Sequence, residues 1–180
     1  VVGIYLYGSE AASGSRPDSD IDLLFLTRRS LTSTERVALV SLLLGVSGWK
    51  GHESNFPEAS DRRPLELTGA VVDDVRQVRG WPRRDFQFGE WMRGELVDGF
   101  VPVPECDPDL VVLLSAARES HRLLHGQPLR DLVRPVAPNL LQQAQLDLLP
   151  DVVSGFDGDE RNVLLTLARM VVRAESGQIL

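Results

Sequence analysis

Two short apolar runs, separated by a glycine–serine pair and a polar stretch, constrain the fold of this 180-residue chain more than any other feature. Residues 1–7 (VVGIYLY) are rich in β-branched and aromatic side chains, which predicts a strand that ends just before Gly8 and Ser9. Residues 21–26 (IDLLFL) predict a second, neighbouring buried strand. We therefore expect a sheet with a small-residue turn beside one end of it.

Two acidic residues, Asp20 and Asp22, stand at the start of the second predicted strand. Because residues i and i+2 of a strand point to the same side, both carboxylates should project together, across from the Gly8-Ser9 turn. Mg²⁺ takes hard oxygen ligands, usually one or two protein carboxylates plus substrate phosphates. The N–H groups of the turn could hold an anion. This combination predicts a site for Mg²⁺ and a polyphosphate, and with it nucleotidyl transfer.

An Asp-x-Asp triplet alone is more often a solvated turn or a capping acid than a metal site. The whole pattern is more specific: a strand, Gly-Ser, about ten polar or small residues, then Ser19-Asp20-x-Asp22 opening a second apolar strand. It resembles the signature of the nucleotidyltransferase superfamily typified by polymerase β.

A third acid, Glu66, lies in the run 65–72 (LELTGAVV), which predicts a third strand with Glu66 and Thr68 on one side. Glu66 is the single acid of this apolar run and is our candidate for the base that activates an attacking hydroxyl. The same alternation would also fit the solvent face of an edge strand.

The charge and composition of the chain limit the kinds of partner and the cellular compartment that we expect for it. The net charge is −7, and the paired arginines are scattered among acids, so we expect no nucleic-acid partner and favour a cationic small substrate. No apolar stretch is long enough to span a membrane. The lone Cys106 cannot form an internal disulfide, which predicts a reducing, cytoplasmic compartment.

The helical elements follow from caps and periodicity. Thr32 and Glu35 have capping-box spacing ahead of a helix that should stop at Gly45. Further helices are predicted over 109–124, 140–149 and 159–176. Two prolines within 134–139 break the chain, so we predict a first domain over residues 1–134 and a second, helical one over 135–180.

Three segments narrow the superfamily to one family: residues 6–9 together with 19–24, residues 86–91 (FQFGEW), and residues 158–169 (GDERNVLLTLAR). Together they resemble the aminoglycoside adenylyltransferases that modify streptomycin and spectinomycin. The resemblance implies an α/β (α+β) nucleotidyltransferase domain with a mixed sheet, followed by a C-terminal α-helical bundle. ATP and the antibiotic would bind between the two.

The resemblance also implies roles for single residues. Asp20 and Asp22 would bind Mg²⁺, Glu66 would be the catalytic base, and Trp91 and Asp159 would contact the drug. Gly8, Ser9, Ser19 and Arg169 would contact ATP. From the residues alone, Trp91 fits a core position equally well, Asp159 a helix N-cap, and Arg169 a surface charge.

Two features depart from the family pattern. Members that accept streptomycin usually carry an acid at the place of Gly155, so we predict spectinomycin as the better substrate unless Asp157 or Asp151 substitutes. The chain also begins without Met and stops where the family continues with a Pro-Lys-Asp segment. We therefore expect an internal piece of a longer protein, with an incomplete helical bundle. We also expect the protein to be a monomer.

The leading functional hypothesis is transfer of AMP from ATP to a hydroxyl of spectinomycin or a related aminoglycoside, which would give antibiotic resistance. One alternative is adenylylation of a protein or an RNA end, as in toxin–antidote nucleotidyltransferases. Another is a non-catalytic module that binds a nucleotide or a drug.

Overall fold

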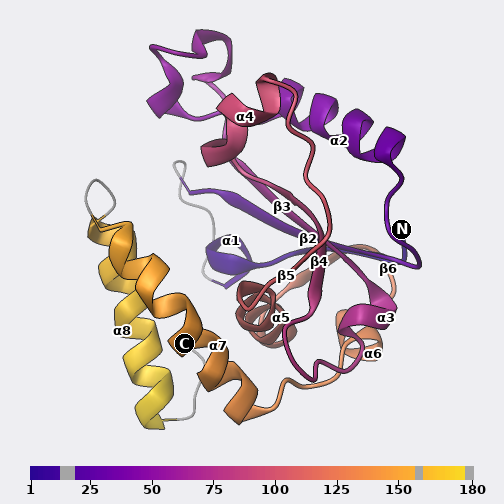
Figure 1. The fold of residues 1–180 in the computed structure, drawn as a ribbon, viewed down its shortest axis with the longest axis vertical. Helices are drawn as coiled ribbons and strands as arrows, with labels where there is room; N and C mark the ends of the chain where they lie inside the picture. The colour runs from indigo at the N-terminus through magenta and orange to yellow at the C-terminus, as the bar shows by residue number, and fades with distance from the viewer. Residues whose placement is uncertain (13–18, 157–159, 177–180) are drawn as a thin grey trace.

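The chain folds into a mixed β-sheet with helices on both faces and a pair of long helices standing outside one of them (Figure 1). The computed structural model describes residues 1–12, 19–156 and 160–176. The strands are β1 (Gly3–Leu6), β2 (Ile21–Thr27), β3 (Leu65–Val71), β4 (Arg83–Phe88), β5 (Glu105–Cys106) and β6 (Arg122–Gly126). The α-helices are α1 (Gly8–Ala12), α2 (Ser33–Val46), α3 (Val72–Val75), α4 (Arg93–Val97), α5 (Asp109–Glu119), α6 (Leu129–Leu132), α7 (Pro138–Ser154) and α8 (Glu160–Ser176). Short 3₁₀ helices are η1 (Lys50–His52), η2 (Pro57–Ala59) and η3 (Glu90–Met92).

The described strands form one sheet in the order β5-β4-β3-β2-β1-β6. The central pair β2–β3 is parallel, and every other neighbouring pair is antiparallel, which confirms the predicted mixed sheet. In the parallel pair Asp22 lies opposite Glu66. In the next pair Leu67 lies opposite Phe88, so β4 ends where β3 begins. The starts of β2 and β3 and the end of β4 therefore meet at one end of the sheet.

Strand alternation divides the core between the two faces of the sheet. The α5 face carries Tyr5, Leu24 and Ala70, which pack with α5 and α6. The α2 face carries Phe25 and Leu67, among others, and is covered by α2 and α4 (Figure 1). Asp22 and Glu66 continue the alternation of Leu24 and Ala70, so their side chains belong to the α5 face, beyond the end of its apolar core.

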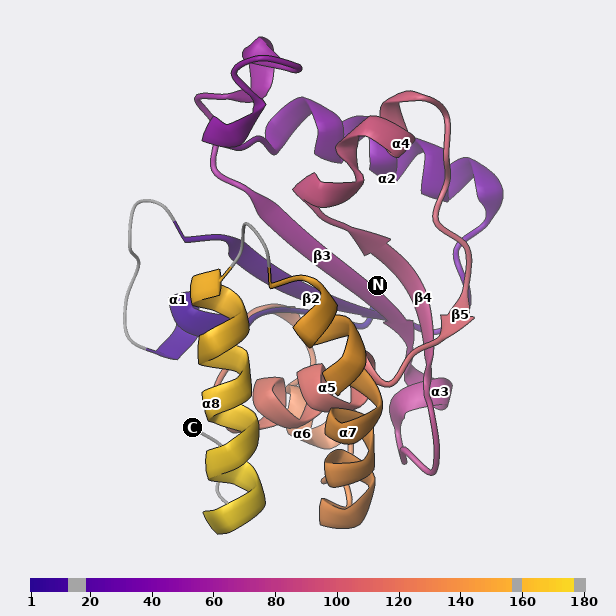
Figure 2. The ribbon, with the colours of Figure 1, turned by 60° about the vertical axis from the view of Figure 1, so that its left-hand side comes forward.

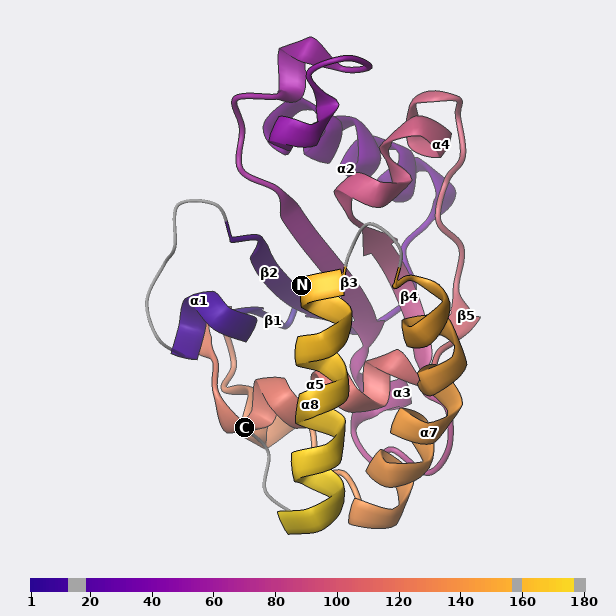
Figure 3. The same cartoon turned by 90° about the vertical axis from the view of Figure 1, so that its left-hand side faces the viewer.

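The pair α7–α8 forms a layer outside α5. Helix α7 packs against α5, and α8 packs against α7 (Figures 2 and 3). The C-terminal end of α7 and the N-terminal end of α8 stand at the level of the start of β2 in both views. The two helices thereby approach the acidic end of the sheet from its α5 face. Among the described residues, no helix combines the length and apolar character needed to cross a membrane.

Local sequence signals account for part of this structure. The capping box at the start of α2 is present: Thr32 Oγ1 accepts from the Glu35 N–H, and the Glu35 carboxylate accepts from the Thr32 N–H at 2.7 Å. Helix α2 continues through Gly45 to Val46, one residue beyond the predicted stop. Strand β4 was not predicted from the sequence.

The helix predicted over 109–124 is wrong in its last five residues. Helix α5 ends at Glu119, and residues 122–126 form β6, which pairs with the free edge of β1. Pairing with β6 gives the backbone N–H and C=O groups on the edge of β1 hydrogen-bond partners. This stabilisation from a distant segment outweighs the local preference of residues 122–124 for a helix. The His121 ring packs edge-on against Tyr5.

Candidate active site

The candidate active site is the acidic end of the sheet, where Asp22 faces Glu66 across the β2–β3 pair. Both side chains are half-buried. Burial, followed by repulsion from Asp20 and Glu10, raises the pKa of Asp22 to about 7. Burial, followed by repulsion mainly from Asp22, raises the pKa of Glu66 to about 8. The structure thus brings the three predicted acids into one electrostatic cluster, although Asp20 precedes β2 and is exposed.

Gly8 closes one side of this cluster. It begins α1 with a φ of +70°, a conformation that glycine adopts without the steric cost of a side chain. A methyl group at this position would overlap the Asp22 carboxylate. The adjacent Tyr7 N–H donates to the Asp22 carbonyl oxygen at 3.0 Å, which fixes the turn against β2. Glycine is therefore required both by the backbone and by the approach of the acid.

Arg63 connects helix α1, which follows the Gly8 turn, to the residue just before Asp20. Its Nη2 donates to Glu10 Oε2 in α1 at 2.9 Å and to the Ser19 carbonyl oxygen at 2.7 Å. Its Nε is buried and has no hydrogen-bond partner among the described residues. Ser19 is held in this way directly before Asp20, whereas the Ser9 side chain is exposed on α1. Sequence reasoning missed Arg63 because it lies in a stretch that reads as a polar loop.

A fourth acid, Asp109 at the start of α5, adjoins the cluster. Burial, followed by repulsion from Asp107, raises the pKa of Asp109, while Arg84 works in the opposite direction. Asp109 also contributes to the raised pKa of Glu66. Arg84 is engaged by other acids: it lies 2.8 Å from Asp107 and 2.6 Å from Glu105. The helix was predicted, but nothing in its sequence indicated that its first residue would face Glu66.

Tyr7 completes the lining on the side of β1. The residue is buried, and burial, followed by the nearby Glu66 and Asp22 carboxylates, raises the pKa of its hydroxyl. The hydroxyl therefore stays protonated and can donate. The site combines acidic side chains, a neutral hydroxyl and a glycine turn.

Trp91 lies at the same end of the sheet, three residues after the end of β4. Its side chain is 62% exposed, so it is not a core residue. The indole ring lies over Gly89, where a Cβ atom would overlap it. The neighbouring Glu90 and Arg93 are buried instead, so the backbone beneath the exposed ring is anchored.

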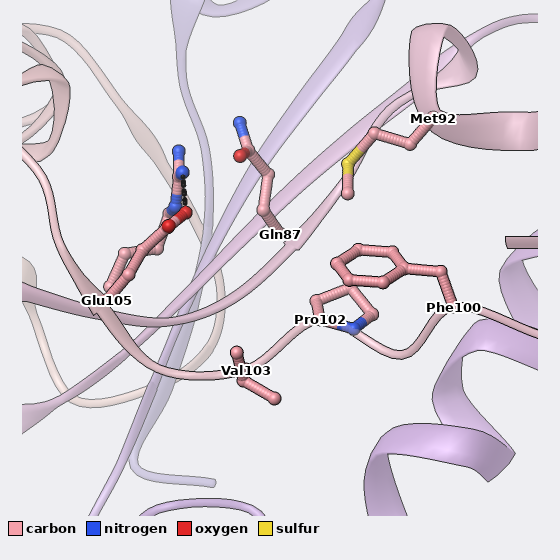
Figure 4. Close-up of a pocket in the computed structure, with 7 residues that line it drawn as sticks. Gln87, Met92, Phe100, Pro102, Val103 and Glu105 are labelled. Carbon is pink, nitrogen blue, oxygen red and sulfur yellow. Dashed lines mark hydrogen bonds and ion pairs between the residues drawn. The ribbon is translucent and has the colours of Figure 1, made fainter. Parts of the chain in front are cut away.

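A small pocket opens beside β4, next to these elements (Figure 4). Gln87, which lies opposite Thr68 on the Glu66 side of the sheet, forms one wall. Met92 and Phe100 form an apolar wall, and the chain at Pro102 and Val103 closes the outer side. The pocket places an apolar surface close to the acidic cluster.

Two predicted site residues cannot be placed. Asp159 lies outside the described residues, and the Arg169 side chain is likewise not described. Gly155, which caps the end of α7, is described: a Cβ atom there would meet only the Asp151 and Val152 carbonyl oxygens, at 3.7 and 3.8 Å.

The donor chemistry of the acidic cluster fits a hard cation. Among the described residues, no three His, Cys, Asp or Glu side chains are arranged to hold a metal ion by themselves. Mg²⁺ does not need such a set, because it commonly takes one or two protein carboxylates and completes its shell with phosphate and water. The repulsion that raises the pKa values of Asp22 and Glu66 is the kind of interaction a bound cation relieves.

Comparison with known proteins agrees with this geometry. Residues 131–180 match the family model described as the C-terminal domain of aminoglycoside adenylyltransferase. The chain is 39% identical to a spectinomycin 9-adenylyltransferase of Campylobacter jejuni, over 94% of this chain and 63% of that protein. It is 38% identical to an aminoglycoside (3'')(9) adenylyltransferase of Klebsiella pneumoniae, over 99% of this chain and 67% of that protein.

A solved structure shares the fold. The crystal structure of spectinomycin adenyltransferase AAD(9) from Enterococcus faecalis, with ATP and spectinomycin, superposes with a TM-score of 0.90 at 27% identity. The match covers 99% of this chain and 70% of that chain.

The mixed sheet, its acidic end and the helical layer beside it define a nucleotidyltransferase fold. Within that class, the chain belongs to the aminoglycoside adenylyltransferase family. It spans 63% to 67% of the length of the two relatives described above.

Proposed function

We propose that this protein transfers AMP from ATP to a hydroxyl of an aminoglycoside antibiotic, with spectinomycin as the preferred acceptor, and so confers resistance. The observation that carries the proposal is the pairing of Asp22 with Glu66 beside the Gly8 turn. Such crowding of carboxylates is unfavourable in the protein alone and becomes useful when a cation and a polyphosphate bind there. The names of the relatives support the same reaction.

Glu66 is proposed as the base. The raised pKa of about 8 makes the ionised Glu66 carboxylate a stronger proton acceptor than an ordinary glutamate, and a cation bound beside Asp22 would favour this ionised form. The freed oxygen then attacks the α-phosphorus of ATP and forms a new P–O bond. The bond to the bridging oxygen breaks in line with it, and pyrophosphate leaves with the electron pair.

Asp20 and Asp22 are proposed to hold Mg²⁺, which would neutralise charge on the phosphates during transfer. On the nucleotide side, Gly8 lets the Asp22 carboxylate approach the turn closely, and Ser9 and Ser19 lie on the two segments that Arg63 connects. From the family resemblance, Gly8, Ser9 and Ser19 are proposed to contact ATP. From the family resemblance, Arg169 is proposed to contact the triphosphate.

Trp91 is proposed as the surface on which the drug rests. Its exposed ring offers a flat apolar face at the end of β4, at the same end of the sheet as Glu66. Such a face suits a sugar ring or a cationic group. Asp159, from the family resemblance, would add a carboxylate for the cationic drug.

We also propose the division of the chain into a nucleotidyltransferase domain over residues 1–134 and a helical domain over 135–180. A monomeric, cytoplasmic enzyme without a nucleic-acid partner is part of the same proposal. The net charge of −7 supports the absence of a polyanionic partner and favours attraction of a polycation.

A transfer assay with α-labelled ATP and a panel of aminoglycosides, using the whole protein, tests this function. We expect labelled spectinomycin and release of pyrophosphate, both lost in Asp22→Asn. Label on RNA or protein with none on any drug would favour the toxin–antidote alternative. ATP binding with no release of pyrophosphate would leave only a binding module.

A further inference from the structure

A buried network around Glu90 lies directly beneath the exposed Trp91. Glu90 is 7% exposed, yet both of its carboxylate oxygens are occupied. Arg93 donates to Oε2 at 2.7 Å and to Oε1 at 3.0 Å, and His52 Nε2 lies 2.8 Å from Oε2. The Ser47 hydroxyl donates to Oε1. Although burial works in the opposite direction, the bonds from Arg93 and Ser47 hold the pKa of Glu90 below its ordinary value.

The Ser47 hydroxyl reaches a second element. While it donates to Glu90, it accepts the Leu65 N–H at 2.9 Å. Leu65 opens β3 and immediately precedes Glu66. Ser47 is fully buried, so water cannot replace either bond. One hydroxyl therefore joins the strand start that carries Glu66 to the segment that carries Trp91.

The rest of the network fixes this junction to the fold. Arg93 donates to the Ser47 carbonyl oxygen at 2.8 Å, just after α2. The His52 ring packs edge-on between Trp49 and Phe56. These contacts connect the segment between α2 and β3 to the Glu90 network. The Arg93 guanidinium also lies 5.8 Å from the centre of the Phe56 ring. A buried ion pair with every partner satisfied favours a single arrangement over alternatives.

We propose that Ser47 and Glu90 are positioning residues that set Glu66 and Trp91 relative to each other, and so align the drug hydroxyl with its base. The proposal rests on the proposed function, because it assigns Glu66 to the base and Trp91 to the drug. Neither Ser47 nor Glu90 needs to touch a substrate. The bonds from Ser47 to Leu65 and Glu90 carry the coupling.

Ser47→Ala tests the coupling, because it removes both bonds and only one heavy atom. We expect faster amide hydrogen exchange at both Leu65 and residues 90–92, measured without drug. The drug KM should rise and kcat fall, each by about 3- to 10-fold, because small misplacements of reacting groups are costly. The KM for ATP should stay within twofold. A merely structural loss would lower the fraction of active enzyme and leave both KM values unchanged.

Ser60→Ala is the matched control. Ser60, like His52, lies in the segment between α2 and β3. Its hydroxyl donates to the nearby Pro57 carbonyl oxygen at 2.8 Å. It should leave exchange and kinetics unchanged. His52→Leu is a second variant that keeps apolar packing but removes one partner of Glu90. It should speed exchange at residues 90–92 and raise the drug KM without changing exchange at Leu65.

The outcomes separate this inference from the proposed function. If Trp91→Ala raises the drug KM while Ser47→Ala and His52→Leu do not, the positioning role is overturned and the drug surface stands. If Trp91→Ala leaves the drug KM unchanged, the assignment of Trp91 in the proposed function has failed. Unchanged exchange at both segments in Ser47→Ala would overturn the coupling itself.

Discussion

Glu66 and Glu90 lie at the same end of the sheet, yet the structure treats the two carboxylates in opposite ways. Glu66 faces further acids, and its pKa is raised to about 8. Glu90 has Arg93, His52 and Ser47 around it, and its pKa is lowered. A buried acid that the fold needs is supplied with internal partners. The acids around Glu66 instead repel one another, which fits the proposed role of this site in binding a cation and phosphates from outside the chain.

The strongest way to break this comparison is to remove a site acid that should bind the cation. Asp22→Asn changes a charge without changing volume, so the fold should persist. We expect transfer to fall by about 10³-fold or more, equivalent to about 4 kcal/mol of barrier. Asp20→Asn should behave alike. Steady-state transfer over a Mg²⁺ titration measures the effect. Activity within a few-fold of the unmodified protein would contradict the metal assignment.

Glu66→Gln should separate chemistry from binding. Glutamine fits the same place but cannot accept the proton, so we expect kcat to fall by about 10²- to 10⁴-fold. ATP and Mg²⁺ should still bind, which calorimetry can measure. If ATP binding disappears together with turnover, Glu66 is a nucleotide ligand or a structural residue instead of the base.

The preference between spectinomycin and streptomycin tests the helical side of the site, where Gly155 ends α7. Streptomycin carries two guanidinium groups, and without an acid at Gly155 one lacks a partner, which costs about 1.5–3 kcal/mol. We expect kcat/KM to favour spectinomycin by about 10- to 150-fold. The matched variant is Gly155→Asp, which has space for a Cβ atom and should narrow the gap. Equal kcat/KM for both drugs in the unmodified protein would show that Asp151 or Asp157 already supplies the charge.

The sequence was sufficient where the determining interactions are local. The capping box at Thr32 and Glu35 and the β2 and β3 strands were predicted from the residues and are present. The mixed sheet is also present, but it was expected from the family resemblance. Gly8 and Asp22 were expected to adjoin, and the close approach of the acid explains why a glycine is needed there.

The sequence was insufficient where contacts are distant along the chain. Residues 122–124 were predicted as the end of a helix, but pairing with the β1 edge places them in strand β6. Asp109 comes close enough to Glu66 to raise its pKa because α5 packs on the same face of the sheet. The Glu90 network joins Ser47, Glu90 and Arg93 through hydrogen bonds that no sequence motif predicts. Trp91 was equally compatible with a core position until its exposure was known.

The comparison between the two glutamates predicts opposite effects on stability. The folded-state pKa of Glu66, about 8, lies above its ordinary value of 4.5, so its stability contribution is fully present below pH 4.5. That contribution is lost as the pH rises through about 8. Without Mg²⁺ at pH 9, Glu66→Gln should therefore raise the free energy of unfolding, by about 1–3 kcal/mol after allowance for solvent and for coupling to Asp22.

Glu90→Gln should do the reverse. The pKa of Glu90 is lowered, so its carboxylate stabilises the fold above its ordinary pKa, and this contribution is lost as the pH falls through the folded-state value. At pH 9 the substitution leaves the buried Arg93 without a counter-charge and should cost about 2–4 kcal/mol. Urea unfolding of both variants at pH 5 and pH 9 measures the difference. Destabilisation of both variants at pH 9 would mean that Glu66 already has a compensating partner, and the distinction between a ligand site and a structural network would not hold.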